Sequence, residues 1–403
     1  MGTVSQLHGR TRAPAHRIES DEEAVEAARR LASGFAAGAS DRDINRTLPH
    51  QEVEAVSLSG LLGISVPADY GGLDISNAVL AEIIAILSQA DPSIAEVAEA
   101  HFYVLEALRS DGSEEQKAQF FARALAGDRF GSAQCDTLAG PAAADATRLT
   151  DDGPGHRING RKLHASGIFF ADWIAIFAFD RLGRLTMSLV PREAEGIQII
   201  DDWDGFGQRT TGAGTVIAHN VYVGADAVVP HHKAFERPTT IGPVGEIGHA
   251  GIDLGIARAA LAETLAYVRN RGQSANGCER GTADPLAVAR IGEVSSRIEA
   301  AAAMIERAGR KIDVAQINPA EANIVEAAVA VAVARALSAE IAVGAADALF
   351  ELAGTSSTRI GLNLDRHWRN ARTHTLQESP RWKYHLVGSY YLNGTAPPNN
   401  GRN

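Results

Sequence analysis

Three long alanine-rich segments constrain the fold of this chain more than any other feature. They cover about 245–271, 285–314 and 319–352, and each carries intermittent Ile, Val and Leu among its alanines. Side chains of low bulk let helices approach one another closely, so these segments predict long helices packed as a bundle. Some of these predicted helices are apolar on more than one face, which favours burial against another subunit and therefore an oligomer.

The N-terminal part of the chain is also predicted to be mostly helical, up to about residue 125. Apolar residues recur at helical spacing between 78 and 110. Two pairs have capping-box spacing at expected helix starts, namely Ser20 with Glu23 and Ser113 with Gln116. These signals predict several helices before the first strand.

Between about 130 and 230 the apolar pattern changes from a helical period to alternation. The predicted strands include about 173–179, 185–190 and 216–223. Asn159-Gly160 is a strong hairpin signal because both central residues of such a turn must accept positive φ, so a strand is expected on each side of it. This region is therefore predicted to be an antiparallel sheet.

Together these patterns predict an α+β protein that is mostly α. Its 403 residues exceed one typical hydrophobic core, so several packed parts are expected. The predicted parts are a flexible arm at 1–18, an N-terminal helical domain at 19–128, a central antiparallel β-domain at 129–236 and a C-terminal four-helix bundle at 237–403.

Charge and composition exclude several classes of function. The net charge of −11 argues against a general nucleic-acid binder. No run of eighteen apolar residues and no apolar signal-peptide core occur, so a cytoplasmic protein without membrane attachment is expected. Cys135 and Cys278 are too few for a disulfide framework or a four-thiolate zinc site. Adjacent residues on a loop seldom chelate one ion, so His231-His232 is placed at the surface and no metal site is predicted.

The densest group of ligand-binding side chains lies near the C-terminus, between residues 369 and 378. It contains two guanidiniums, an amide, an imidazole and a carboxylate: Arg369, Arg372, Asn370, His374 and Glu378. Fixed guanidinium and amide donors suit a planar, phosphorylated anion, so a phosphate-bearing ligand is predicted here. A nicotinamide site is not expected, because the glycines of 242–248 have the wrong spacing and no βα unit precedes them.

The order of helical domain, β-domain and helical bundle resembles the acyl-CoA dehydrogenase family over nearly the whole chain. The residues that carry this likeness are 60–67 with 70–72, 160–167 with 173–174, and 207–215. Within that superfamily, further residues resemble the flavin-dependent monooxygenases typified by dibenzothiophene monooxygenase, and more closely the sulfur-acquisition oxidoreductases of the SfnB type. These residues are 130–133, Ser166, Trp203, 369–376 and 390–394.

The resemblance implies a homotetramer, built as a dimer of dimers, in which each subunit binds FMN. A separate NAD(P)H:flavin reductase would supply reduced FMN, and O2 would be activated as a flavin C4a-hydroperoxide that oxygenates a small organosulfur substrate. FAD-binding members of the superfamily carry Gln-Phe-Gly after an Arg, whereas this chain has Arg271-Gly272-Gln273. FMN is therefore expected rather than FAD, with Arg271 as a phosphate ligand across the subunit interface.

The resemblance also assigns roles around the flavin ring. Ser132 and Ser166 would offer hydroxyls to the isoalloxazine or its peroxide, and Trp203 would wall the flavin against water. Strand-end hydrogen bonding for the serines and core packing for the tryptophan are the alternatives. His101 and Tyr103 are candidates for the substrate cavity, with packing again as the alternative.

At the C-terminal cluster, Arg369, Asn370 and Arg372 would hold the phosphate and ribityl chain of FMN. His374 would lie close to the flavin or the substrate. The alternative is a salt-bridge cluster at a subunit interface.

One part of this cluster departs from the oxygenase pattern, which has His-Asp after Thr-Leu. This chain has Gln377-Glu378, and glutamine cannot transfer a proton near neutral pH, so the task would fall to His374, His101 or water. Glu378 occupies the register where acyl-CoA dehydrogenases keep the base that removes the substrate α-proton. An FAD dehydrogenase with Glu378 as base is therefore an alternative, and a non-catalytic flavin-binding scaffold is a third.

Overall fold

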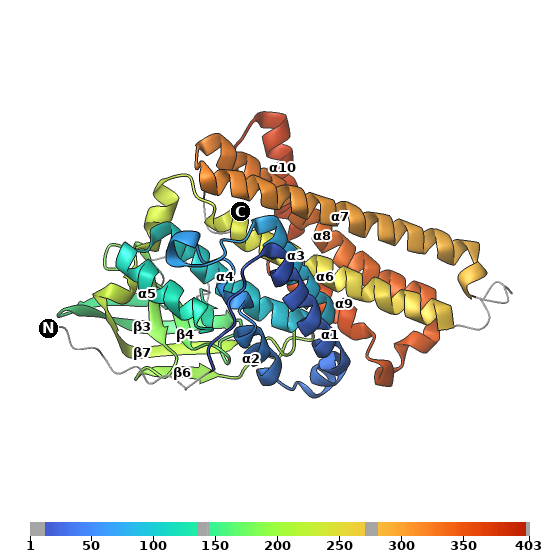
Figure 1. Ribbon diagram of the computed structural model, residues 1–403, viewed down its shortest axis with the longest axis horizontal. Coiled ribbons are helices and arrows are strands. Elements are labelled where there is room, and N and C mark those ends of the chain that lie inside the picture. Colours follow the sequence, from blue (N-terminus) through green and yellow to red (C-terminus); the bar gives the residue numbers. More distant parts are fainter. Residues whose placement is uncertain (1–12, 135–142, 144, 271–280, 400–403) are drawn as a thin grey trace.

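A computed structural model describes residues 13–134, 143, 145–270 and 281–399 of the chain. Helices from the N-terminal part lie between a β-sheet and a bundle of long helices (Figure 1). Most of the predicted flexible arm lies outside the described residues, as do Cys135, Cys278 and Arg271.

Five helices precede the sheet. They are α1 (Asp21–Asn45), α2 (His50–Leu58), α3 (Asn77–Ala90), α4 (Pro92–Asp111) and α5 (Glu114–Leu125). The predicted cap at Ser20 is confirmed, since its side chain accepts from the Glu23 backbone N–H, and Ser113 with Gln116 forms a full capping box. Helix α4 is buried along most of its length, so polar side chains on it are held inside the protein.

The sheet has eight strands. They are β1 (Phe130–Ala133), β2 (Arg148–Asp152), β3 (Gly155–Ala165), β4 (Trp173–Phe179), β5 (Leu185–Pro191), β6 (Ile197–Ile200), β7 (Gly214–Gly224) and β8 (Val228–Val229). The strand order is β6-β7-β3-β2-β4-β5-β8, with β1 paired to β4. Most neighbours are antiparallel, but β4 pairs in parallel with both β1 and β2, so the sheet is mixed.

The hairpin predicted at Asn159-Gly160 was wrong. Strand β3 runs straight through both residues, and the pairing with β7 shifts register between Ile158 and Gly160. Asn159 accepts a hydrogen bond from the Asn220 backbone N–H through its side chain, and Gly160 takes a φ of 156°. The local signal therefore marks a β-bulge, while the chain reverses at Gly153, where φ is 59°.

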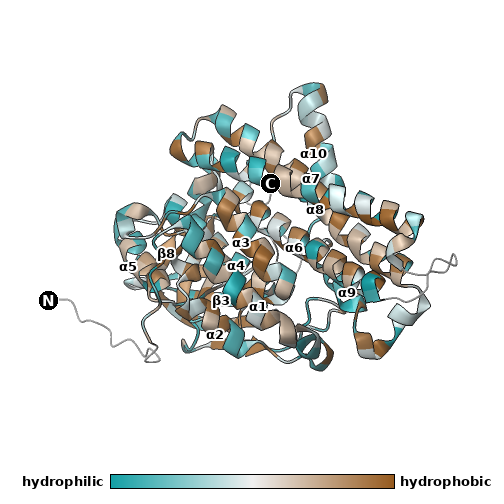
Figure 2. Cartoon of the chain, turned by 45° about the vertical axis from the view of Figure 1, so that its right-hand side comes forward, coloured by the Kyte–Doolittle hydropathy of each residue, from teal (hydrophilic) through white to brown (hydrophobic). Residues whose placement is uncertain are grey.

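The C-terminal helices are α6 (Ile241–Asn270), α7 (Pro285–Ile317), α8 (Glu321–Ala353), α9 (Asp365–His374) and α10 (Pro380–Asn393). Short 3₁₀ helices link the elements: η1 (Leu61–Gly63), η2 (Ala68–Tyr70), η3 (Ala225–Ala227), η4 (His231–Glu236), η5 (Gly281–Ala283), η6 (Thr355–Thr358) and η7 (Ile360–Leu362). Among the described residues, α8 alone is long and apolar enough to cross a membrane, but 72% of its most apolar window is buried inside the protein. It is a core helix of the bundle, and apolar residues of α6 and α8 lie inside the helical layer (Figure 2).

Glycines let α6 lie very close to α3 and α4. A Cβ at Gly251 would lie 2.6 Å from the Ala81 carbonyl oxygen, and one at Gly255 would lie 2.4 Å from the Ser88 Cβ. At Gly248 a Cβ would lie 2.8 Å from the Glu99 side chain. These glycines serve helix packing, and their close approach brings polar residues of α6 against polar residues of α4.

Candidate active site

A buried glutamate on α4 joins three parts of the chain. The Oε1 atom of Glu96 accepts hydrogen bonds from the Ser166 hydroxyl at 3.2 Å and from the Gln377 side-chain amide at 3.1 Å. Ser166 lies in the turn after β3, and Gln377 follows α9. Glu96 is only 3% exposed, so two residues predicted for the flavin site meet at one buried carboxylate.

His374 lies at the end of α9 and is completely buried. Its Nδ1 is 2.6 Å from Asp253 Oδ1, and its Nε2 is 3.1 Å from His249 Nδ1 and 3.5 Å from Glu96 Oε2. His249 and Asp253 lie one turn apart on α6, and Arg335 of α8 forms a buried ion pair with Asp253. The imidazole of His374 is thus enclosed by polar groups.

The charges of this cluster follow from its contacts. Burial alone would lower the pKa of His374, but the Asp253 carboxylate, and then Glu96, raise it to about 9. Burial would raise the pKa of Glu96, but hydrogen bonding to His374 lowers it to about 2. Burial lowers the pKa of His249 to about 3. Near neutral pH, a cationic His374 therefore lies between two carboxylates and donates its Nε2–H toward neutral His249 or Glu96.

More ionisable groups surround this centre. Burial, followed by the Glu96 charge, raises the pKa of Glu99 well above its usual range. Glu378 lies 2.8 Å from Lys383 Nζ, which also lies 3.2 Å from Glu246 on α6. Burial and the Glu246 carboxylate raise the pKa of Glu378. Glu378 is thus held in an ion pair with Lys383.

A second group of predicted flavin residues meets at a tight turn. The Trp203 indole N–H donates to the Gln208 carbonyl oxygen at 3.0 Å, and Asn370 Oδ1 accepts from the Gln208 backbone N–H at 2.7 Å. Gln208 has a φ of 51°. Its buried side-chain Nε2 has no hydrogen-bond partner among the described residues. Trp203 and Asn370, far apart in sequence, are therefore neighbours.

The two arginines of the C-terminal cluster differ in their surroundings. Arg369 lies 2.6 Å from Asp43 and 2.7 Å from Asp365, and it also donates to the Phe206 carbonyl oxygen. Arg372 lies over the Trp368 ring, 6.0 Å from its centroid, and has no ion pair with any described residue. Arg369 is engaged within the fold, whereas Arg372 keeps its charge available.

His101 and Tyr103 are both buried on α4. His101 Nδ1 accepts from the Phe130 backbone N–H at 3.1 Å, so its Nε2–H donates to the Leu62 carbonyl oxygen at 2.9 Å. Burial lowers the pKa of His101 to about 4, which agrees with this neutral tautomer. Both ring nitrogens are bonded to backbone, which is the arrangement of a packing residue.

The structure also shows the surroundings of Ser132 and His231. The Ser132 hydroxyl on β1 accepts from the Gln134 side-chain amide at 2.9 Å. His231 was wrongly placed at the surface, because it is 1% exposed and packs between the rings of Phe177 and Phe235, each 5.1 Å away. The fold of η4 against the sheet buries it.

Among the described residues, one group has metal-ligand spacing, and it is the cluster already described. Ligand atoms of Glu96, His249 and His374 lie within 4.8 Å of one another.

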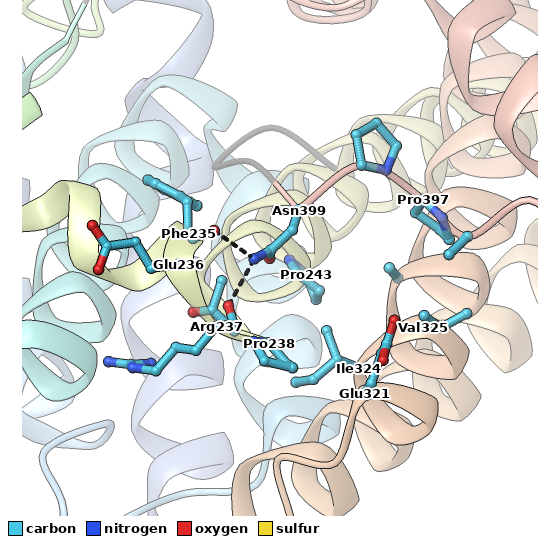
Figure 3. Close-up of a pocket in the computed structure, with 14 residues that line it drawn as sticks. Phe235, Glu236, Arg237, Pro238, Pro243, Glu321, Ile324, Val325, Pro397 and Asn399 are labelled. Carbon is cyan, nitrogen blue, oxygen red and sulfur yellow. Dashed lines mark hydrogen bonds between the residues drawn. The ribbon is translucent and has the colours of Figure 1, made fainter. Parts of the chain in front are cut away.

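A surface pocket of about 310 Å³ shares no residue with this cluster. There Asn399 donates to the carbonyl oxygens of Phe235 and Arg237, and Pro243 and Ile324 complete the wall (Figure 3).

The sequence predictions missed Glu96, His249 and Asp253. Each is an ionisable residue on a helix that is otherwise largely apolar, and Asp253 follows His249 by four residues, so both face the same side of α6. A charged residue within an apolar helix is the signal that could have identified them, because buried charges need partners.

The fold and the sequence place the chain in a known family. Residues 19–128 match the acyl-CoA dehydrogenase N-terminal domain, and residues 247–379 match the acyl-CoA dehydrogenase C-terminal domain. The chain therefore belongs to the acyl-CoA dehydrogenase family.

Several proteins with similar sequences are named as monooxygenases. The chain is 28% identical to a dibenzothiophene monooxygenase of Mycolicibacterium goodii, covering 93% of this chain and 94% of the relative. It is 27% identical to a probable FMNH2-dependent monooxygenase, SfnC, of Pseudomonas putida, covering 93% and 96%.

Two solved structures with a similar fold are TdsC and the monooxygenase MsuC. TdsC from Paenibacillus sp. A11-2, in complex with FMN and indole, has a TM-score of 0.88 at 27% identity and covers 95% of this chain and 100% of its own. The methanesulfinate monooxygenase MsuC from Pseudomonas fluorescens has a TM-score of 0.87 at 28% identity, covering 94% and 99%.

Proposed function

We propose that this protein is an FMN-dependent monooxygenase that oxygenates a small organosulfur compound. The observation that carries the proposal is the match, over nearly the full length of both chains, to the FMN-bound TdsC structure. The buried site supports it, because Ser166, Gln377 and His374 converge on Glu96.

The residues of the site fit FMN. Gln208 Nε2 and the Thr373 hydroxyl are buried without a partner among the described residues, so they are available to a polar ligand. Arg372 is the better candidate of the two arginines for the phosphate, since Arg369 is already paired with two carboxylates. Ser166, Trp203 and Asn370 would contact the ring and ribityl chain. Reduced FMN, when bound, would react with O2 and supply one oxygen atom to the substrate.

The electrons would come from another protein. Gly245 and Gly248 of α6 lie against Tyr103 and Glu99 and serve helix packing. A relative that this chain matches over 96% of the relative's length is named as a probable FMNH2-dependent monooxygenase. We therefore assign an NAD(P)H:flavin reductase as partner and the cytoplasm, where such reductases find NAD(P)H, as the location.

The substrate class rests on the relatives. One is named for dibenzothiophene and one solved structure for methanesulfinate, and both compounds carry an oxidisable sulfur. They differ greatly in size, so both belong in a substrate screen.

A homotetramer is proposed from the exposed apolar residues of the C-terminal helix. On α10, Trp382, Tyr391 and Leu392 are 66%, 71% and 84% exposed. Apolar side chains of this size, grouped on one helix, favour burial against another subunit.

The dehydrogenase alternative has less support. Glu378 would have to accept a substrate proton, but it lies 2.8 Å from Lys383 Nζ in an ion pair. The scaffold alternative rested on Gln377, and Gln377 has a specific partner in Glu96.

The proposal is tested by flavin titration followed by turnover. We expect FMN to bind more tightly than FAD, as measured by quenching of flavin fluorescence. Reduced FMN from an added reductase should then convert methanesulfinate or dibenzothiophene to an oxygenated product. Reduction of bound FAD by an acyl-CoA would instead establish the dehydrogenase, and absence of flavin binding would contradict both.

A further inference from the structure

We propose that Glu96, His249 and His374 form a binding site for one divalent transition-metal ion, of which Zn²⁺ is the type. The three residues lie on α4, α6 and α9, and α6 contacts both of the other helices (Figure 1). The inference goes beyond the proposed function and does not depend on it, because it concerns an ion held by protein side chains and not the flavin.

The three ligand atoms surround a point at metal-bonding distance. His374 Nε2 lies 3.1 Å from His249 Nδ1 and 3.5 Å from Glu96 Oε2, and His249 Nδ1 lies 4.0 Å from Glu96 Oε2. The centre of a triangle with these sides is about 2.1 Å from each corner, which is the length of zinc bonds to imidazole nitrogen and carboxylate oxygen. An ion at this point therefore meets all three side chains where they already lie.

Hydrogen bonds alone leave this group incomplete. Glu96 is 3% exposed, and its Oε2 makes no hydrogen bond to a described residue. In the metal-free protein one proton on His374 Nε2 can serve either His249 or Glu96, but His249 Nδ1 and Glu96 Oε2 are too far apart to bond to each other. A buried charged oxygen needs a cationic partner or a metal. A metal ion would replace that proton and contact all three atoms at once.

The groups behind the two imidazoles have the arrangement of a metal site. His374 Nδ1–H donates to Asp253 Oδ1 at 2.6 Å, and Arg335 holds the same carboxylate in a buried ion pair. The Nε2 atom of His249 faces Glu99 Oε2 at 3.8 Å. Each ring thus directs one nitrogen to the shared point and the other to a carboxylate. Histidines that bind metals commonly donate their second ring N–H to such a carboxylate, which fixes the tautomer and the orientation of the ring.

The ligand types select the class of ion. Two imidazole nitrogens and one carboxylate oxygen are a ligand set of zinc sites that keep a fourth position open, whereas Mg²⁺ and Ca²⁺ take oxygen ligands. The His249 side chain is 20% exposed, so an ion can enter from its side. Once bound, the ion would join α4, α6 and α9 and should raise the unfolding temperature of the protein.

The test is calorimetric titration of flavin-free, chelator-treated protein with ZnCl2. We expect one zinc ion per subunit, and both H249Q and E96Q should weaken binding by more than about a hundredfold. D253N should weaken it by about 10- to 100-fold with the stoichiometry unchanged, because Asp253 only orients a ligand. H385Q is the matched control, since His385 is an exposed histidine on α10 outside the cluster, and it should bind zinc like the wild-type protein. MgCl2 should give no binding heat.

A second set of measurements needs only the wild-type protein, in case a variant does not fold. Co²⁺ should give the intense visible absorption of a four-coordinate ion, and anomalous diffraction from crystals grown with ZnCl2 should place one ion between Glu96, His249 and His374. Zinc found only at exposed histidines would overturn the inference, and so would binding that both H249Q and E96Q leave unchanged. Zinc binding without FMN binding would contradict the proposed function alone, whereas FMN binding without zinc binding would contradict the metal site alone.

Discussion

At the scale of single residues, the molecule keeps a cation in its interior. His374 has no exposed surface, and its charge is balanced by Asp253 and Glu96 rather than by water. A group whose pKa is raised from 6.5 to about 9 by folding stabilises the fold fully below pH 6.5 and loses that contribution as pH rises through 9.

The free energy of unfolding should therefore fall between pH 6.5 and 9. The pKa difference corresponds to roughly 3 kcal/mol for a buried group. Urea midpoints measured across this range test it, and the fall should be absent from H374Q. A midpoint that does not change with pH in the wild-type protein would contradict the assigned charge.

The two arginines of α9 should respond differently to substitution. Arg369→Ala leaves the Asp43 carboxylate with less charge compensation, so it should lower the free energy of unfolding by about 1–3 kcal/mol. Arg372→Ala should weaken FMN binding by about 1.5–3 kcal/mol through loss of one charge-assisted contact, with little change in stability. Paired unfolding and flavin titrations separate these effects, and the reverse pattern would assign the phosphate to Arg369.

Sequence patterns could indicate which residues carry chemistry but not which of them meet. His374 and Gln377 stood out because the C-terminal cluster is contiguous. Glu96, His249 and Asp253 reach His374 only through the crossing of α4, α6 and α9, and no local spacing encodes that contact. Arg369 illustrates the converse, because its partner Asp43 lies more than three hundred residues away.

At the scale of elements, local periodicity predicted the long helices and the strand pair β4–β5 to within a few residues. These segments are regular, and their pattern repeats over several turns or alternations. The Asn159-Gly160 signal failed because positive φ serves a bulge as well as a turn, and pairing with β7 selects the bulge.

The contact between the Gln208 turn and α9 gives a test at this scale. A Cβ at Gly207 would lie 2.1 Å from the Arg369 carbonyl oxygen. Gly207→Ala should therefore push the turn away from α9 and weaken FMN binding at least about tenfold, because Asn370 loses the Gln208 N–H. Flavin titration measures the loss.

Gly34 on α1 provides the control substitution for Gly207→Ala. A Cβ at Gly34 meets nothing within 4 Å, and Gly34 lies inside the helix, so Gly34→Ala should stabilise the protein by about 0.5–1 kcal/mol. Unchanged FMN binding in Gly207→Ala would show that the turn does not position the cofactor.

At the scale of the whole molecule, the family's three-part order is visible in the sequence because each part has its own period. The way in which the subunits assemble is not visible in the sequence, because an exposed apolar helix does not specify its partner. Leu392 on α10 is 84% exposed. Leu392→Asp should convert a tetramer to smaller species in light scattering, whereas a wild-type protein that is already monomeric would contradict the proposed assembly.

The most direct test of the central claim is the origin of the oxygen in the product. Purified protein is supplied with FMN, a flavin reductase, NADH and ¹⁸O2, with methanesulfinate or dibenzothiophene as substrate, and the product is analysed by mass spectrometry. One ¹⁸O atom per product molecule, formed only with the flavin system present, is the predicted result. Oxygen derived from water, or an unmodified substrate with all O2 released as H2O2, would contradict a monooxygenase.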